Sequence, residues 1–161
     1  MEIVITEAEL GAKAKRNEEV KKWLDRYRKK KRETIRLKLE YDELVSSQEA
    51  VSAVNYDGIH VQSGGDNGSD LANLMISRDY HLTKIIKAQA QLEEIRTEIS
   101  NALEQLDEDE AEVMSYRYLQ LDGTEQRTWE EICVLTHFSW RKAHGLHSDA
   151  LDTLAQIIGV R

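Results

Sequence analysis

The chain has 161 residues, with 22 Lys and Arg against 30 Asp and Glu, so its formal net charge is −8. It contains no proline, which permits long uninterrupted helices and disfavours turn-rich all-β folds. Its single cysteine, Cys133, excludes an intrachain disulfide framework. No apolar run approaches the roughly 18 residues of a membrane span, and the start, MEIVITEAEL, lacks the features of a secretory signal. We therefore expect a cytoplasmic, all-α protein that is not associated with a membrane.

The charge is distributed unevenly along the chain. Between Lys13 and Glu40 there are 13 Lys and Arg but 5 Asp and Glu, a balance of +8. Between Asp107 and Arg161 there are 5 Lys and Arg but 11 Asp and Glu, a balance of −6. The acidic total thus hides a basic segment, and net charge alone does not exclude a polyanionic partner.

The first predicted helix begins at Thr6, whose spacing from Glu9 is that of a capping box. Apolar residues then recur every three or four positions, with an interruption at Arg28–Arg32. The pattern ends at residues 55–69, a stretch of Gly, Asn, Asp and Ser that predicts a loop. The basic stretch is typical of a solvated helix face, although contacts with phosphates or with the acidic C-terminal segment are alternatives.

A second helix is predicted from Ser69 or Asp70 onward. We expect one stripe of it to face the first helix, formed by Leu71, Met75, Leu82, Ile85, Leu92, Ile95, Ile99, Leu103 and Leu106. Two long amphipathic helices joined by a loop predict an antiparallel, coiled-coil-like hairpin over residues 1–105, although pairing between chains is the alternative. Because a two-helix seam buries little area, we expect the hairpin either to form a homodimer or to dock onto the C-terminal segment.

Residues 106–161 are predicted to form a second domain of shorter helices. Asp107 and Glu110 have cap spacing, residues 121–127 form a loop, and Thr128 with Glu131 forms a second capping box. Residues 136–139 form a turn, in which His137 takes a position that often holds a glycine with positive φ. The last helix is predicted to start after the cap residue Ser139, to run to about Ile158 and to end at Gly159. Its expected inward face is Ala143, Leu146, Ala150, Leu151 and Leu154.

A helix of about eight residues, a four-residue turn and a longer amphipathic helix together have the pattern of a helix-turn-helix. Cys133 supplies the small residue where the two helices cross, and Phe138 supplies an apolar plug in the turn. Trp129 is predicted to be a core anchor, whereas Trp140 is predicted to be exposed. No acidic residue lies between His137 and Ser148, as expected of a surface that approaches phosphates in the major groove.

Residues 106–154 resemble the DNA-binding fourth region of bacterial sigma factors, and more closely the ArpU/RinA-like transcriptional regulators of phages and prophages. The residues that carry the resemblance are Val113-Met114, Arg117-Tyr118-Leu119, Thr128–Ile132, Ser139–Ala143, Leu146-His147 and Ala150-Leu151. The layout of the upstream half, from about residue 15, is also similar. Asp149 and Asp152 depart from the family, since relatives commonly carry basic residues there.

The resemblance implies a phage regulator, an activator of late or packaging genes, that binds double-stranded DNA and contacts host RNA polymerase. The expected DNA-binding residues are Thr128, Ser139, Trp140, Arg141, Lys142, His144 and His147. Two alternatives are a DNA-packaging protein of the small terminase subunit type and a coiled-coil adaptor that binds only protein. The acidic cluster Asp107–Glu112 has two interpretations. Its negative charge either stabilises the N-terminus of its helix by interacting with the helix dipole, or it forms a surface that faces the polymerase.

Catalysis and metal binding find less support in the sequence. It has no glycine-rich phosphate loop of an NTPase or dinucleotide-binding type, and no serine or histidine has a placed third partner, so we predict no catalytic residues, no enzyme activity and no cofactor. Cys133 with His137 and His144 with His147 have workable spacings for zinc. Structural zinc sites usually contain at least two cysteines, so we predict no metal site.

Overall fold

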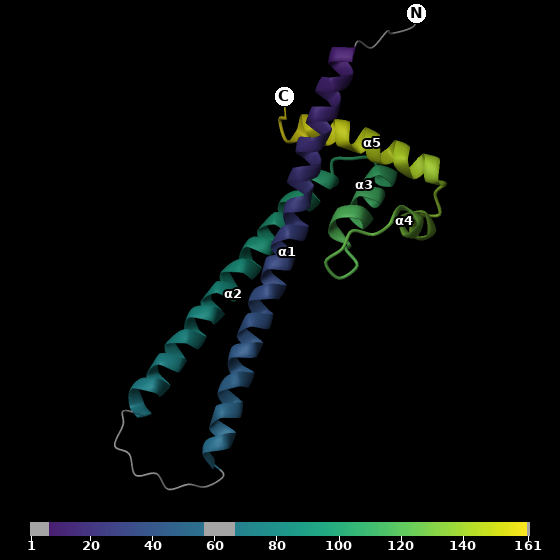
Figure 1. The fold of residues 1–161 in the computed structure, drawn as a ribbon. Coiled ribbons are helices and arrows are strands. Elements are labelled where there is room, and N and C mark those ends of the chain that lie inside the picture. Colours follow the sequence, from purple (N-terminus) through teal and green to yellow (C-terminus); the bar gives the residue numbers. More distant parts are fainter. Residues whose placement is uncertain (1–6, 57–66, 161) are drawn as a thin grey trace, which may run out of the picture. The chain divides into compact units, whose positions relative to one another are not determined.

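The computed structural model describes the backbone of residues 7–56 and 67–160, and the side chains of residues 7–49 and 72–160. The described residues form only helices, turns and one isolated bridge, so the predicted all-α class is confirmed (Figure 1). The elements in chain order are α1 (Glu7–Tyr56), α2 (Asn67–Leu103), α3 (Glu108–Met114), the π-helical turn η1 (Ser115–Leu119), α4 (Trp129–Thr136) and α5 (Trp140–Ile157).

The predicted loop at residues 55–69 is too long at both ends. Helix α1 continues through Tyr56, and α2 already begins at Asn67. Extending an existing helix adds one backbone hydrogen bond per residue, which is enough to include weak helix formers at its ends. The middle of that loop and the predicted cap residue Thr6 lie outside the described residues.

The chain divides into two compact units that cut across the predicted boundary at 105/106. Unit 1 consists of residues 1–31 and 92–161, and unit 2 consists of residues 32–91. The C-terminal helices α3 to α5 therefore belong to the same compact unit as the first part of α1 and the last part of α2.

One hydrophobic core explains this grouping in unit 1. The first part of α1 runs antiparallel to the last part of α2, and both pack against the C-terminal helices (Figure 1). The most buried contributors come from four elements: Val20, Leu24, Ile99, Met114 and Leu154. The side chain of Glu98 on α2 adds a polar clamp, because it accepts a hydrogen bond from Trp23 Nε1 at 3.3 Å and pairs with Arg26 at 2.9 Å.

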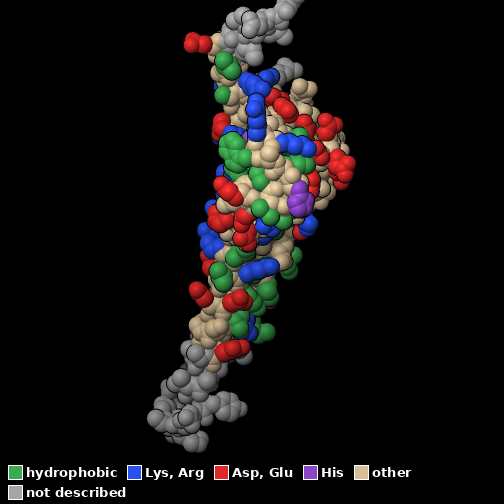
Figure 2. All heavy atoms as spheres, turned by 90° about the vertical axis from the view of Figure 1, so that its right-hand side faces the viewer, with side chains coloured by type: hydrophobic (Ala, Val, Ile, Leu, Met, Phe, Trp, Pro, Cys, Tyr) green, Lys and Arg blue, Asp and Glu red, His purple; other side chains and the backbone are tan. Residues whose placement is uncertain are grey.

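The predicted stripe on α2 is only partly correct. Ile85, Ile99 and Leu103 are buried as expected, but Met75 is 60% exposed and Leu82 is 38% exposed. A contact between two helices covers a narrow strip, so apolar residues beyond its edge stay in solvent. Eight large hydrophobic side chains are consequently exposed among the described residues of unit 2: Ile35, Leu39, Leu74, Met75, Ile76, Tyr80, Leu82 and Ile86. Figure 2 shows hydrophobic side chains at the surface above the lower grey atoms.

Candidate nucleic-acid interface

Helix α4 begins with the capping box that the sequence predicts. The Thr128 hydroxyl accepts a hydrogen bond from the backbone N–H of Glu131, and the Glu131 carboxylate accepts one from the backbone N–H of Thr128 at 2.7 Å. These contacts lower the pKa of the Glu131 carboxyl below its usual value. The box satisfies two backbone donors and fixes the start of the helix. By contrast, the predicted cap residue Asp107 of α3 makes no side-chain capping hydrogen bond.

The turn between α4 and α5 has the predicted left-handed residue. His137 adopts φ 58° and ψ 22°, a conformation that glycine tolerates better than any residue with a Cβ atom. Ser139 then caps α5 by accepting a hydrogen bond from the backbone N–H of Lys142 at 3.2 Å. Phe138, the predicted plug, is only half-buried, and the Lys142 ammonium lies 3.8 Å from its ring centroid. The turn thus sets the direction in which α5 starts.

Replacing His137 with glycine should raise the free energy of unfolding by about 0.5–1 kcal/mol, because it removes the Cβ strain at this positive φ. The histidine side chain is exposed, so little packing is lost. Thermal denaturation followed by circular dichroism measures the change. His137→Ala is the control, since it keeps the Cβ and should give no such gain; equal stabilisation by both variants would contradict this explanation.

The first turn of α5 presents the polar and aromatic side chains that the sequence places there. Trp140 is 59% exposed, as predicted, and Arg141 and Lys142 are exposed too. The Lys142 ammonium, however, lies 2.7 Å from a carboxylate oxygen of Asp109 on α3. The acid-free sequence after His137 therefore does not correspond to an acid-free surface, because α3 places a carboxylate beside it.

His144 lies between two tryptophans. Its ring centroid is 3.9 Å from that of Trp129 and 3.8 Å from that of Trp140, with both pairs tilted by 35°. Trp129, predicted as a core anchor, is half-buried, and it links α4 to α5 through this stack. Aromatic pairs of this kind are worth about 0.5–1.5 kcal/mol beyond their buried area, so the stack stiffens the start of α5.

His147 points toward the interior of unit 1. Its Nε2 lies 3.0 Å from the Tyr118 hydroxyl, and the two rings are stacked. Burial, followed by the charges of Lys21 and Arg117, lowers the pKa of His147 from 6.5 to about 4. The His147 imidazole therefore binds a proton more readily in the unfolded chain than in the folded one. Its contribution to the free energy of unfolding is fully present above pH 6.5 and is lost as the pH falls toward 4.

The inward face of α5 is close to the predicted one. Ala143, Ala150, Leu151 and Leu154 are buried, while Leu146 is half-buried. The helix ends in a Schellman motif, in which Gly159 has φ 73° and the backbone N–H of Val160 donates to the carbonyl of Ala155 at 3.0 Å. Cys133 is half-buried at the predicted crossing position.

Two residues that contact α5 were not predicted to do so from the sequence: Asp109, which pairs with Lys142, and Tyr118, which bonds His147. These contacts join positions 33 and 29 residues apart, and no local pattern encodes such pairs. Within the described part of the chain, no group of three or more His, Cys, Asp or Glu side chains could hold a metal ion.

Comparison with known proteins gives no relative for this chain: no family model matches it, and neither does any curated protein or solved structure. None of the described helices combines the length and apolar character needed to cross a membrane.

Proposed function

We propose that the protein is a sequence-specific regulator of transcription, of the phage ArpU/RinA-like type, that binds double-stranded DNA through α4 and α5. The observation that carries this proposal is the exposed first turn of α5, where Trp140, Arg141 and Lys142 follow a helix start that the Ser139 side chain caps. A helix-turn-helix inserts the start of its second helix into the major groove, and it needs that start to be both exposed and rigid.

The chemistry of this first turn fits a duplex. Arg141 can donate two hydrogen bonds to guanine O6 and N7, and Lys142 can pair with a phosphate once it leaves Asp109. Thr128 and Ser139 lie at the helix starts, where hydroxyls and backbone N–H groups commonly contact phosphates. His144 and His147 keep positioning roles, because the first is stacked between tryptophans and the second bonds Tyr118.

The acidic side chains around α5 limit the expected affinity. Asp152 pairs with Lys13 of α1 at 2.6 Å, and Asp109 pairs with Lys142, so two of these carboxylates are already neutralised within the protein. The acidic first turn of α3, Glu108 to Glu110, is the surface that we propose for host RNA polymerase. An adaptor that binds only protein would use the same acidic surface but would not bind DNA at low salt.

The experiment is a salt-titrated binding measurement, by fluorescence anisotropy, on DNA from the promoter region beside the gene. We expect affinity to fall steeply with salt, since each neutralised phosphate contributes a slope of about 0.9 to log K against log salt. A specific site should bind at least about 1,000-fold more tightly than random DNA of the same length. Absence of binding at low salt would reject the proposal and favour the adaptor.

We further propose that unit 2 joins two copies of the chain. Met75, Leu82 and Ile86 recur on one face of α2, and all three are exposed. Among the described side chains of this unit, three are buried: Thr34, Ile85 and Ala88. A second copy that packs against the exposed face would bury the apolar area that two helices alone leave in water.

Sedimentation velocity tests this association. Wild-type protein should sediment as a dimer, whereas Met75→Glu plus Ile86→Glu should sediment as a monomer at the same concentration, because both substitutions place charge on the apolar face. Asn73→Glu plus Lys84→Ala changes the net charge by the same amount on the opposite face of α2 and should leave the dimer intact. A wild-type monomer would contradict the dimer, and a ring of eight or more subunits would favour the terminase alternative.

A further inference from the structure

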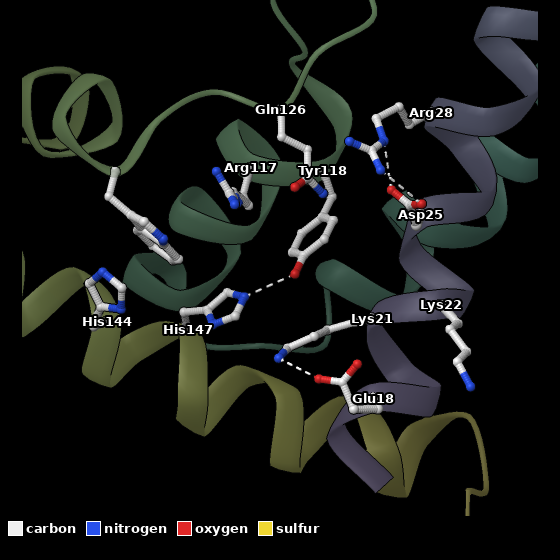
Figure 3. Close-up of a pocket in the computed structure, with 11 residues that line it drawn as sticks. Glu18, Lys21, Lys22, Asp25, Arg28, Arg117, Tyr118, Gln126, His144 and His147 are labelled. Carbon is white, nitrogen blue, oxygen red and sulfur yellow. Dashed lines mark hydrogen bonds and ion pairs between the residues drawn. The ribbon is translucent and has the colours of Figure 1, made fainter. Parts of the chain in front are cut away.

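A cavity of about 520 Å³ lies within unit 1, between α1, η1 and the helices α4 and α5 (Figure 3). Four cationic side chains line it, together with two carboxylates: Lys21, Lys22, Arg28, Arg117, Glu18 and Asp25. Burial lowers the pKa of His147 to about 4, so this ring is uncharged at neutral pH, and the four cations and two carboxylates together carry a formal charge of +2. Such an excess of positive charge in a concave site favours an anion.

Arg117 is the most unusual of these cations. Its guanidinium is half-buried, lies 5.0 Å from the ring centroid of Trp129 and donates from Nη1 to the carbonyl oxygen of Arg127. Burial lowers the pKa of Arg117, and no carboxylate is among the groups that shift it. An arginine has five N–H donors and stays charged in proteins, so this group retains donors and a full charge for a ligand.

The other cations of the lining differ in how firmly carboxylates of α1 hold them. Lys21 pairs with Glu18 of its own helix at 2.9 Å, an exposed pair of the kind that contributes little and exchanges readily. Arg28 is held by Asp25 at 2.8 Å. Figure 3 shows the Lys21 ammonium reaching toward the ring of His147, whereas Lys22 points away from that ring. Lys21 and Arg117 are therefore the two cations best placed for an anion.

The aromatic side of the cavity offers a further hydrogen-bonding atom. The Nε2 atom of His144 is buried and has no hydrogen-bond partner, which is costly unless a ligand or water satisfies it. The face of Trp129 lines the same wall. The volume exceeds that of an inorganic phosphate several times over, so a phosphate group together with the molecule that carries it fits the space.

We infer that this cavity binds a phosphate group, with Arg117 and Lys21 as its cationic contacts and His144 as an additional hydrogen-bonding group. Phosphate is favoured over a single carboxylate because its oxygens accept hydrogen bonds from more than one cation at once. A phosphomonoester dianion also matches the net charge of the lining, whereas a phosphodiester of DNA carries a single charge. The group can come from a small phosphorylated compound or from the DNA backbone beside α5. The second source rests on the function proposed above, whereas the first does not.

Inorganic phosphate is the probe for the site itself. At constant ionic strength, phosphate should shift the NMR signals of the Trp129 indole and the His147 ring saturably. It should also raise the pKa of His147, because the anion offsets Lys21 and Arg117, which face this ring from α1 and η1. Tyr118, His144 and Glu18 line the same cavity, and Glu18 pairs with Lys21 in the absence of the anion.

Substitutions separate the site from general charge effects. Lys21→Gln and Arg117→Gln should each weaken phosphate binding about tenfold, in keeping with the loss of one charged hydrogen bond. Lys29→Gln removes the same charge from an exposed position of α1 outside the cavity and should change nothing. If Arg117→Gln does not fold, Lys21→Gln alone still tests whether a cation of the cavity binds phosphate. Absence of saturable shifts in the wild type, or equal binding by Lys21→Gln and Lys29→Gln, would overturn the inference.

The source of the phosphate is resolved by adding DNA. If the backbone supplies it, inorganic phosphate should compete with DNA, and Lys21→Gln should reduce the salt slope of DNA binding by about 1. If a small compound supplies it, phosphate should bind without displacing DNA. Phosphate binding without any DNA binding would reject only the regulator function. DNA binding without phosphate binding, unaffected by Lys21→Gln, would reject only the cavity site.

Discussion

Replacing Arg141 and Lys142 together with alanine should weaken binding to the specific DNA site about 100-fold. A bidentate contact of arginine to guanine is worth about 1–3 kcal/mol, and a lysine-phosphate contact adds to it. Lys142 must first leave Asp109, whose carboxylate is 2.7 Å away, so its net share is the smaller one. The salt slope should fall by about 2 if both cations meet phosphates, or by about 1 if Arg141 reads a base.

A matched control removes two cations from α2. Lys87→Ala plus Arg96→Ala lowers the positive charge equally at exposed positions outside α4 and α5, and its DNA affinity should stay within a few-fold of the wild type. Anisotropy titrations at several salt concentrations measure both the DNA affinity and its dependence on salt. Equal and salt-insensitive binding by the wild type and the α5 variant would remove α5 from the mechanism.

Asp109→Asn tests the role of Lys142 in DNA binding independently, because it should change the affinity in the opposite direction. It frees Lys142 without altering α5, so the single variant should bind DNA more tightly than the wild type, whereas the change should have no effect when Lys142 is already alanine. This non-additivity is what a double-mutant cycle detects between residues in contact.

The features that the sequence predicts well are those that neighbouring residues determine. The Thr128 box, the Ser139 cap, the left-handed His137 and the Gly159 stop all depend on backbone groups within four residues of the side chain concerned. Each can therefore be recognised from spacing alone. The bounds of α4 and α5 follow from them almost to the residue.

The features that the sequence does not predict depend on which helices meet. His147 has the spacing of a surface residue on α5, yet it bonds Tyr118, because η1 packs on that side. Asp109 approaches Lys142 across 33 residues. Met75 and Leu82 fit the helical period of a seam but lie beyond the strip that α1 covers. The periodicity of apolar residues shows which face of a helix is apolar, but it does not show which other helix packs against that face.

Leu24→Ala should lower the free energy of unfolding by about 2–5 kcal/mol, the range observed when a large buried side chain is truncated and leaves a cavity. Leu24 lies on α1, far in sequence from α4 and α5, and it is fully buried in the core that Met114, Tyr118 and Leu154 also form. The loss should therefore appear in the C-terminal helices as well as in α1. Chemical denaturation followed by circular dichroism measures the magnitude.

The decisive measurement is whether the C-terminal helices melt with α1. Because one core joins them, the indole signals of Trp129 and Trp140 should disappear in the same transition as the helical signal of unit 1, and Leu24→Ala should shift both together. Leu10→Ala, at an exposed position of the same helix, should change stability by less than about 0.5 kcal/mol. If the indole signals persisted after α1 unfolds, residues 106–161 would be an autonomous domain. If they are lost together, the first part of α1 is a structural component of the proposed DNA-binding unit, and any ligand that tightens its contact with η1 stabilises α5 by the same linkage.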